Sequence, residues 1–445
     1  MRIKIVIGIL IFLCLIPFYR GIARETLELT IDEAVGIAIK NNRSVIIAER
    51  KVDEQKAGMG EVRSTFFPKM TGSANYTKLD VAPYIALGKK SPFPMPPGSP
   101  KKITIGDDHL YDLSFSVQQP LFTGFALTNG YEMAKDSWEA AKNEHAKVEN
   151  NIIFQTKEAY YTLLKLGELV EISIESVKLM EAHITDLTNM LKVGMIAEND
   201  LLKAQVQLSE TKLMLISAEN NEKLMQRQFC TVLRIPLTTV IELETPLEYS
   251  EERIELDAII ETALENRPEI HVLENQVQIA EKGVAVAKSQ RYPQLLAVYN
   301  YNYKRPNREY EKEFYSTWTA GLVAQLNIFD WGGIHYSVTQ AKLRHRQSEE
   351  GKKQLADAII LEANQAYLNL REAIQRIRVA EVNITQAEEN YRVTQKKFSH
   401  GLVTNTELLD ANTALTRARM SHTTALSDYL MARAMLEKVT GIENK

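Results

Sequence analysis

Residues 163–191, LLKLGELVEISIESVKLMEAHITDLTNML, place eight apolar side chains and one serine at alternating spacings of three and four residues without a slip. The positions of this seam are Leu163, Leu166, Val170, Ser173, Val177, Met180, Ile184, Leu187 and Leu191. A strict seven-residue repeat keeps one face of a helix against a partner helix, so the stretch predicts left-handed coiled-coil packing. The predicted helix covers about residues 126–193, roughly 100 Å at ~1.5 Å per residue. That length favours a coiled coil over an ordinary bundle core.

The same seam returns 207 residues later, at Leu370, Ala373, Ile377, Ala380, Ile384, Ala387, Tyr391, Thr394 and Phe398. Nearer the N-terminus, residues 29–41 match 254–266 at an offset of 225. The chain is therefore a duplication. The offset changes between residues 77 and 118, where six of the 14 prolines lie. We therefore expect an extended Pro-rich loop at 79–109, a first repeat at 24–246 and a second at 247–445.

Each copy also contains two stretches that alternate apolar and polar side chains, between a first helical segment (residues 31–63 in the first copy) and the long helix. In the first copy they are residues 70–77 and 111–118, and in the second 295–303 and 317–326. A period of two with one polar side predicts strands with one apolar and one wet face. We expect β-hairpins at 69–121 and 294–328, hence four strands per chain in a mainly α protein with a small β part.

The N-terminus is typical of a secretory signal peptide, residues 1–23. Arg2 and Lys4 precede an apolar run, Ile5 to Ile16, and Gly21 and Ala23 supply the small residues of a cleavage site. An uncleaved anchor is the alternative. Without residues 1–23 the net charge changes from −4 to −7, because three basic residues and no acids are removed. One cysteine, Cys230, then remains, which excludes an internal disulfide. The balance of charge gives no sign of nucleic-acid binding.

The four strands resemble outer-membrane strands in length, alternation and tyrosine content. Four strands cannot close, and an open edge in lipid leaves unsatisfied amides. The chain is therefore expected to share a transmembrane β-barrel between subunits, of 8 strands in a dimer or 12 in a trimer, and a lumen favours the trimer. Candidates for aromatic residues at the membrane interface are Tyr84, Tyr111, Tyr299, Tyr303, Tyr310, Tyr315 and Trp318. A soluble, tyrosine-rich sheet is the alternative.

The duplicated pattern, the opening Leu-Thr-Ile-Asp-Glu-Ala (residues 29–34), the corner Phe-Asp-Trp-Gly-Gly (residues 329–333) and the Gly-x6-Leu-Leu turns resemble the TolC-like outer-membrane efflux protein family. The resemblance covers nearly all of the chain after residue 23. It implies a homotrimer with a 12-stranded barrel in outer-membrane lipid and a helical tunnel (α-helical barrel) across the periplasm. It also implies an exit duct that passively serves a tripartite efflux pump or a type I secretion system. A periplasmic adaptor (membrane fusion) protein and an inner-membrane transporter of the RND, ABC or MFS type are the implied partners.

The resemblance also implies two sites. The tips of the helical hairpins dock the adaptor in this family, and the matching residues are Gly194, Met195, Ile196, Leu201, Leu202, Gly401, Leu402, Val403, Leu408 and Leu409. Acidic residues one turn apart narrow the tunnel, and the matching positions are Glu407 and Asp410. Three-fold symmetry makes them a ring of six carboxylates, which favours cations. Val403 stands where family members place a basic residue. A capped turn and a solvated helix start are the plainer interpretations of these two segments.

Enzyme classes find little support, because the phosphate-loop, nucleophile-elbow, zinc-protease and Cys-x-x-Cys motifs do not occur in the sequence. The eight histidines are scattered. We therefore expect no enzyme activity, cofactor or metal. A periplasmic coiled-coil adaptor is the remaining rival, since it would share export and a helical hairpin. It would not share a whole-chain duplication with two strand hairpins. The sequence does not specify the transported substrate.

Overall fold

The structure is a computed structural model, and it describes residues 26–86, 102–250, 255–307, 309 and 311–441. The expected signal peptide, the middle of the Pro-rich loop and Tyr310 lie outside these ranges. The described chain forms two compact units. Unit 1 comprises residues 26–46, 148–266 and 360–441, and unit 2 comprises residues 47–147 and 267–359. Each unit is described by itself.

The helices come in pairs of equal length, one member from each copy. Helices α1 (Ile31–Asn41) and α5 (Leu256–Asn266) have 11 residues each, and α2 (Arg43–Ser64) and α6 (Pro268–Ser289) have 22. Helices α3 (Ala126–Lys192) and α7 (Gly333–Ser399) have 67, and α4 (Glu198–Leu233) and α8 (Asn405–Thr440) have 36. The first two pairs start 225 residues apart and the last two 207 apart, as the two sequence offsets require.

The first helical segment is broken, which the sequence interpretation missed. We expected one helical stretch over residues 31–63, but Asn42 separates α1 from α2 with an extended backbone (φ −70°, ψ 125°). Its side-chain Oδ1 accepts a hydrogen bond from the Ser44 backbone N–H at 2.8 Å, so the side chain replaces a helical bond. In the second copy Arg267 has the same conformation, because Pro268 follows it and disfavours a helical residue before it.

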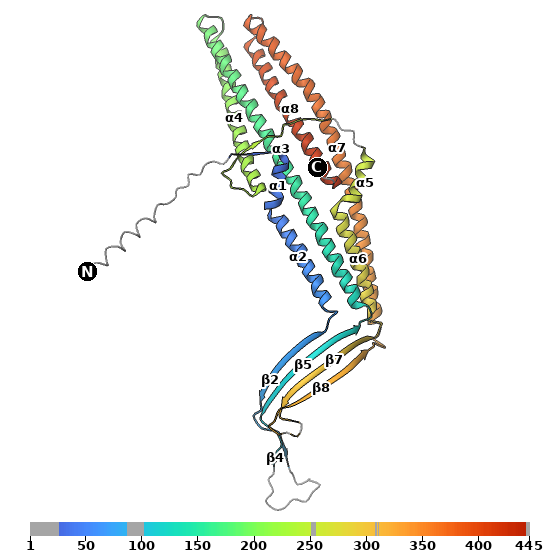
Figure 1. Ribbon diagram of the computed structural model, residues 1–445. Helices are drawn as coiled ribbons and strands as arrows, with labels where there is room; N and C mark the ends of the chain where they lie inside the picture. The colour runs from blue at the N-terminus through green and yellow to red at the C-terminus, as the bar shows by residue number, and fades with distance from the viewer. Residues whose placement is uncertain (1–25, 87–101, 251–254, 308, 310, 442–445) are drawn as a thin grey trace, which may run out of the picture. The chain divides into compact units, whose positions relative to one another are not determined.

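The four expected strands form one antiparallel sheet in unit 2, in the order β2 (Lys69–Lys78), β5 (His109–Phe122), β7 (Gln294–Arg305) and β8 (Tyr315–Gln325). Figure 1 shows these strands side by side. The register aligns Met70 with Val117, Val117 with Tyr299, and Tyr299 with Ala320. Residues paired in this way point to the same face. One face is therefore mostly apolar across all four strands, and the alternation expected from the sequence is confirmed.

Two further strand pairs are too short for a sequence period to reveal. In unit 1, β1 (Thr26–Leu29) runs parallel to β6 (Val240–Leu243). In unit 2, β3 (Tyr84–Ala86) pairs antiparallel with β4 (Lys102–Thr104), on the two sides of the Pro-rich loop. The described parts of that loop therefore continue as a two-stranded ribbon, where we expected only an extended segment.

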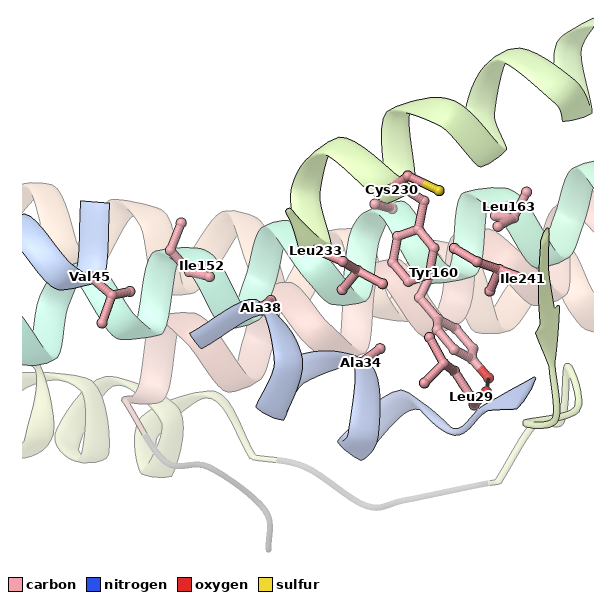
Figure 2. Packing of buried hydrophobic residues seen from close by; sticks show 12 residues of the cluster. Leu29, Ala34, Ala38, Val45, Ile152, Tyr160, Leu163, Cys230, Leu233 and Ile241 are labelled. Atoms are coloured by element: carbon pink, nitrogen blue, oxygen red, sulfur yellow. Dashed lines mark hydrogen bonds between the residues drawn. The ribbon is translucent and has the colours of Figure 1, made fainter. Parts of the chain in front are cut away.

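The core of unit 1 surrounds Tyr160 on α3, which has no exposed surface. Its ring packs edge-to-face on Phe229, and Figure 2 shows it among Leu29, Cys230 and Ile241. Its hydroxyl donates to the Leu29 carbonyl at 2.9 Å and accepts from the Thr245 backbone N–H at 3.1 Å. This side chain therefore ties the strand pair β1/β6 to the helices.

Every residue of the predicted seam is buried or half-buried. On α3, Leu163, Val170, Ser173, Val177, Met180 and Leu187 are buried, and on α7 so are Leu370, Ala373, Ile377, Ala380 and Ala387. Ala387 packs with Leu415 and Ala418 of α8. None of the helices in the described ranges has the length and apolar content needed to cross a bilayer.

Candidate functional site

The first hairpin tip, residues 193–197 between α3 and α4, is closed by a glycine. Gly194 has φ +74°, the left-handed region that glycine adopts without strain. The backbone N–H of Gly194 donates to the Leu191 carbonyl at 3.0 Å, and that of Met195 donates to the Met190 carbonyl at 2.9 Å. This pattern ends a helix and reverses the chain. Met195 is 69% exposed at the apex, while Ile196 is half-buried.

The second tip, residues 400–404 between α7 and α8, has the same construction. Gly401 has φ +70°, its N–H donates to the Phe398 carbonyl, and the Leu402 N–H donates to the Lys397 carbonyl, both at 2.9 Å. Thr404 caps α8, because its side-chain oxygen accepts from the Glu407 N–H at 3.3 Å. Leu402 is 72% exposed and Val403 is half-buried.

The four leucines that follow the tips differ in accessibility. Leu202 is exposed, and Leu201 and Leu409 are half-buried. Leu408 is only 5% exposed. A side chain covered by its own chain offers little surface to a partner, so the adaptor contact expected at Leu408 stays a prediction. Its burial follows from helix geometry, because positions adjacent in sequence point about 100° apart around the helix.

Glu407 and Asp410, the two carboxylates expected to form a gate, lie on the exposed face of α8. Glu407 and Asp410 are three residues apart, so they project from neighbouring turns of the same side. Among the described residues, neither carboxylate has an ion-pair partner. Val403, one turn before Glu407, supplies no basic group. The arrangement leaves two negative charges free to act on solvent ions near the tip.

A buried polar contact joins the two hairpins beside these carboxylates. Asn405, in the first turn of α8, is 4% exposed. Its Oδ1 accepts from His183 Nε2 of α3 at 2.8 Å, and its Nδ2 donates to the Asp200 carbonyl of α4 at 2.9 Å. The Asn405 amide oxygen can only accept, so Nε2 carries the imidazole proton. The His183 ring also packs edge-on against Phe398 at 5.4 Å.

Sequence reasoning missed this contact, because its residues lie 222 and 205 positions apart and follow no repeat. A cavity also lies beside this contact. A cavity of about 610 Å³ lies between α3, α7 and α8, and His183, Tyr391, Leu408 and Asn412 help to line it. At this end the two hairpins are thus joined by polar contacts beside a cavity.

The expected interface aromatics fall on both faces of the sheet. Tyr111, Tyr299, Tyr303 and Trp318 share the apolar face, with the Tyr299 and Trp318 rings stacked at 6.4 Å. Tyr315 pairs with Lys304, so it lies on the polar face. Tyr315 therefore does not share the apolar face with the other four residues.

The sequence interpretation did not single out a second set of aromatic residues. They lie beyond the end of the sheet at which β2 and β7 begin and β5 and β8 end. Phe67, Phe125, Tyr292, Phe329 and Trp331 are exposed there, Trp331 by 88%. Phe125 packs edge-on against Tyr292, and Phe329 packs against Trp331. Such large apolar exposure marks a surface that meets lipid or protein. The glycine-containing corner sequences around Gly124 and Gly332 were the sequence signal that could have indicated these aromatic residues.

The family model of the outer membrane efflux protein matches residues 34–228 and 259–442, one stretch in each copy. The chain belongs to the outer membrane efflux protein family. Among curated relatives, this efflux protein is 19% identical to the outer membrane protein TolC of Vibrio cholerae over 315 residues, 70% of this chain and 72% of that protein. It is 21% identical to the alkaline protease secretion protein AprF of Pseudomonas aeruginosa over 346 residues, 75% and 70% of the two chains.

Solved structures share the fold of this efflux protein. The CmeC outer membrane channel of Campylobacter jejuni superposes with a TM-score of 0.77 at 17% identity, over 92% of this chain and 85% of that one. The open state of the MtrE outer membrane channel of Neisseria gonorrhoeae gives a TM-score of 0.75 at 15% identity, over 92% and 88%. The expected fold class, with long helices and a four-stranded antiparallel sheet, is confirmed.

The family membership also confirms the expected function class and location. This efflux protein is an outer-membrane channel of the kind used in tripartite efflux and type I secretion, in the outer membrane of a Gram-negative bacterium. As a member of a channel family it is not an enzyme.

Proposed function

We propose that three copies of this efflux protein form one passive exit duct, which a periplasmic adaptor connects to an inner-membrane transporter of the RND, ABC or MFS type. The observation that carries the proposal is the open sheet. Its edge strands β2 and β8 have no partner within the described chain, and one of its faces is apolar. Unpaired edge amides in lipid cost several kcal/mol each by general estimate. Neighbouring copies that pair β2 with β8 remove both edges and close a sheet of twelve strands around a lumen.

A second pair of unpartnered surfaces supports the same assembly. Helix α4 exposes a row of apolar residues, and α7 exposes another. The α4 row consists of Leu202, Val206, Leu213, Ile216 and Leu224, and the α7 row of Leu361, Leu368 and Val382. Leu202, Val206, Leu213 and Ile216 follow the spacing of a coiled-coil seam, as does the α7 row, and Leu224 lies on the same side of α4 one position out of phase. Two different surfaces that fit each other between subunits make a head-to-tail interface, and such an interface forms a ring when the rotation between subunits closes, as a three-fold rotation does.

The assembly is tested by mass. We expect the purified, unboiled protein to have about three times the mass of the mature chain in detergent light scattering, with a mostly helical circular dichroism spectrum. Leu213→Asp should reduce that mass towards one chain, because it places a charge in the α4 row. Asn221→Asp, on an exposed position outside the row, is the matched control. A helical monomer that is soluble without detergent would overturn the proposal and favour a periplasmic adaptor instead.

We propose that Glu407 and Asp410 of the three copies converge as a ring that narrows the tunnel near its periplasmic end. Their exposure, their shared side of α8 and their lack of ion-pair partners support this role. Glu407→Ala combined with Asp410→Ala should raise the single-channel current in planar bilayers, because six negative charges and their bulk leave the constriction. An unchanged current would count against the gate.

We propose that the adaptor docks on the tips through Met195, Ile196, Leu402 and Val403, with Gly194 and Gly401 shaping the turns. Leu201, Leu202 and Leu409 complete the docking surface. Leu408 packs beneath it and supports its shape. Exposed apolar side chains at a helix reversal fit a partner helix hairpin. Met195→Glu should reduce cross-linking to the adaptor and leave the trimer intact. The control is Asn199→Asp, on an exposed neighbour in the first turn of α4.

A further inference from the structure

We propose that Arg417 forms a second, positive ring in the tunnel, about two helical turns from the carboxylate ring, and that it weakens the preference of the constriction for cations. The inference rests on the proposed trimer and gate. The exposed side of α8 carries Glu407, Asp410, Ala414, Arg417 and Ser421 in order. At ~100° and ~1.5 Å per residue, Arg417 lies about 20° around the helix from Asp410 and ~10 Å along it. A helix face that turns Asp410 towards the tunnel axis therefore turns Arg417 towards it too.

The charge of Arg417 is free, whereas those of the neighbouring arginines are compensated. Arg419 lies two positions on and is held by Glu175 at 2.7 Å and Glu388 at 3.3 Å. On α7, Arg376 contacts Glu372 at 2.7 Å and Asp428 at 3.6 Å. In the part of the chain that the structure describes, Arg417 has no ion-pair partner. A guanidinium remains protonated at any physiological pH, so this positive charge is permanent.

Two successive rings of opposite sign act differently from one acidic ring. Each copy contributes two carboxylates and one guanidinium, so the trimer has six negative and three positive charges along a short stretch of tunnel. Cations gather at the first ring and meet a barrier at the second, while anions find a favourable position there. The arginine ring therefore moderates the preference for cations. A charge acts over this distance in a salt-filled tunnel, because the Debye length is about 8–10 Å.

The test is the reversal potential of the full-length trimer in planar bilayers under a potassium chloride gradient. We expect Arg417→Gln to raise the potassium-to-chloride permeability ratio at least about two-fold, and Arg417→Glu to raise it further. Arg417→Lys should keep the wild-type ratio. The matched control is Arg392→Gln, since Glu389 already holds that exposed arginine at 2.6 Å. Glu407→Gln with Asp410→Asn should lower the ratio.

These variants separate the inference from the proposal beneath it. If the carboxylate variant shifts the ratio and Arg417→Gln does not, the arginine ring is overturned and the gate stands. If neither variant shifts the ratio, the gate itself fails, and the arginine ring with it. Light scattering is run on the same samples, and an Arg417→Gln protein that no longer forms trimers overturns the inference, because the arginine then serves assembly.

Discussion

The contact of Asn405 with both helices of the first hairpin gives a sharp prediction about opening. Asn405→Ala removes two buried hydrogen bonds, from His183 Nε2 at 2.8 Å and to the Asp200 carbonyl at 2.9 Å. Each such bond contributes about 1 kcal/mol, so the pair contributes about 2 kcal/mol to holding α8 against α3 and α4. If separating the hairpins breaks both bonds, the variant shifts the open-to-closed ratio by roughly 30-fold.

The assay is the fraction of time that single channels spend in the high-current state in planar bilayers, with the melting temperature of the trimer measured in parallel. We expect the open fraction to rise in Asn405→Ala and, less strongly, in His183→Ala. The double variant should exceed Asn405→Ala only slightly, because the two residues share one bond. Asn199→Ala, at an exposed asparagine of α4, is the control. A lower melting temperature with a wild-type open fraction would refute the reasoning, since the bonds would then persist in both states.

Three further predictions concern stability and the tip. Tyr160→Phe should lower the free energy of unfolding by about 1–3 kcal/mol in chemical denaturation, because it leaves the Leu29 carbonyl and the Thr245 N–H without their buried partner. Gly401→Val should cost about 1–2 kcal/mol through its positive φ and weaken adaptor cross-linking while trimers persist; wild-type cross-linking would remove this turn from the docking site. A hydrogen bond from Lys352 lowers the pKa of Glu274 from its usual 4.5, so this pair stabilises the fold above that pH and loses its effect as pH falls through the lowered pKa. Melting curves of wild type and Glu274→Gln should therefore converge as the pH falls below the lowered pKa of Glu274, and a constant gap would disprove the linkage.

The periodic parts of the fold could be predicted because periodicity is the physical signal that packing leaves in a sequence. Burial of Leu163, Val170 and Leu187 follows from their seven-residue spacing, and the faces of the sheet follow from alternation. Asn42 interrupts the first helical segment through a single side-chain hydrogen bond, and the hydrophobic periodicity of the sequence does not predict such a break. The strands β1 and β6 have four residues each, too few to establish alternation.

The site divides in the same way. The glycines of the tips and the side of α8 that carries Glu407 and Asp410 follow from local rules for turns and helices. The link between His183 and Asn405 depends on how the helical hairpins of the two sequence repeats pack within one chain. Rules that use only neighbouring residues do not predict that packing. Leu408 and Leu409 are adjacent and chemically identical, yet Leu408 alone is buried, because their directions on the helix differ.

The equal lengths of the paired helices determine how far the two hairpin tips of one chain reach. Since α3 and α7 have the same length, as do α4 and α8, the two tips of one chain come level with each other. A seven-residue insertion in both α3 and α4 would keep the seam in phase but carry one tip ~10 Å past the other. A change in the length of the helical part must therefore occur as matched insertions in both sequence repeats of the chain. Relatives that have lengthened or shortened the helical part should show paired gaps in an alignment, and a chimaera that joins halves of different length should assemble and yet fail to couple.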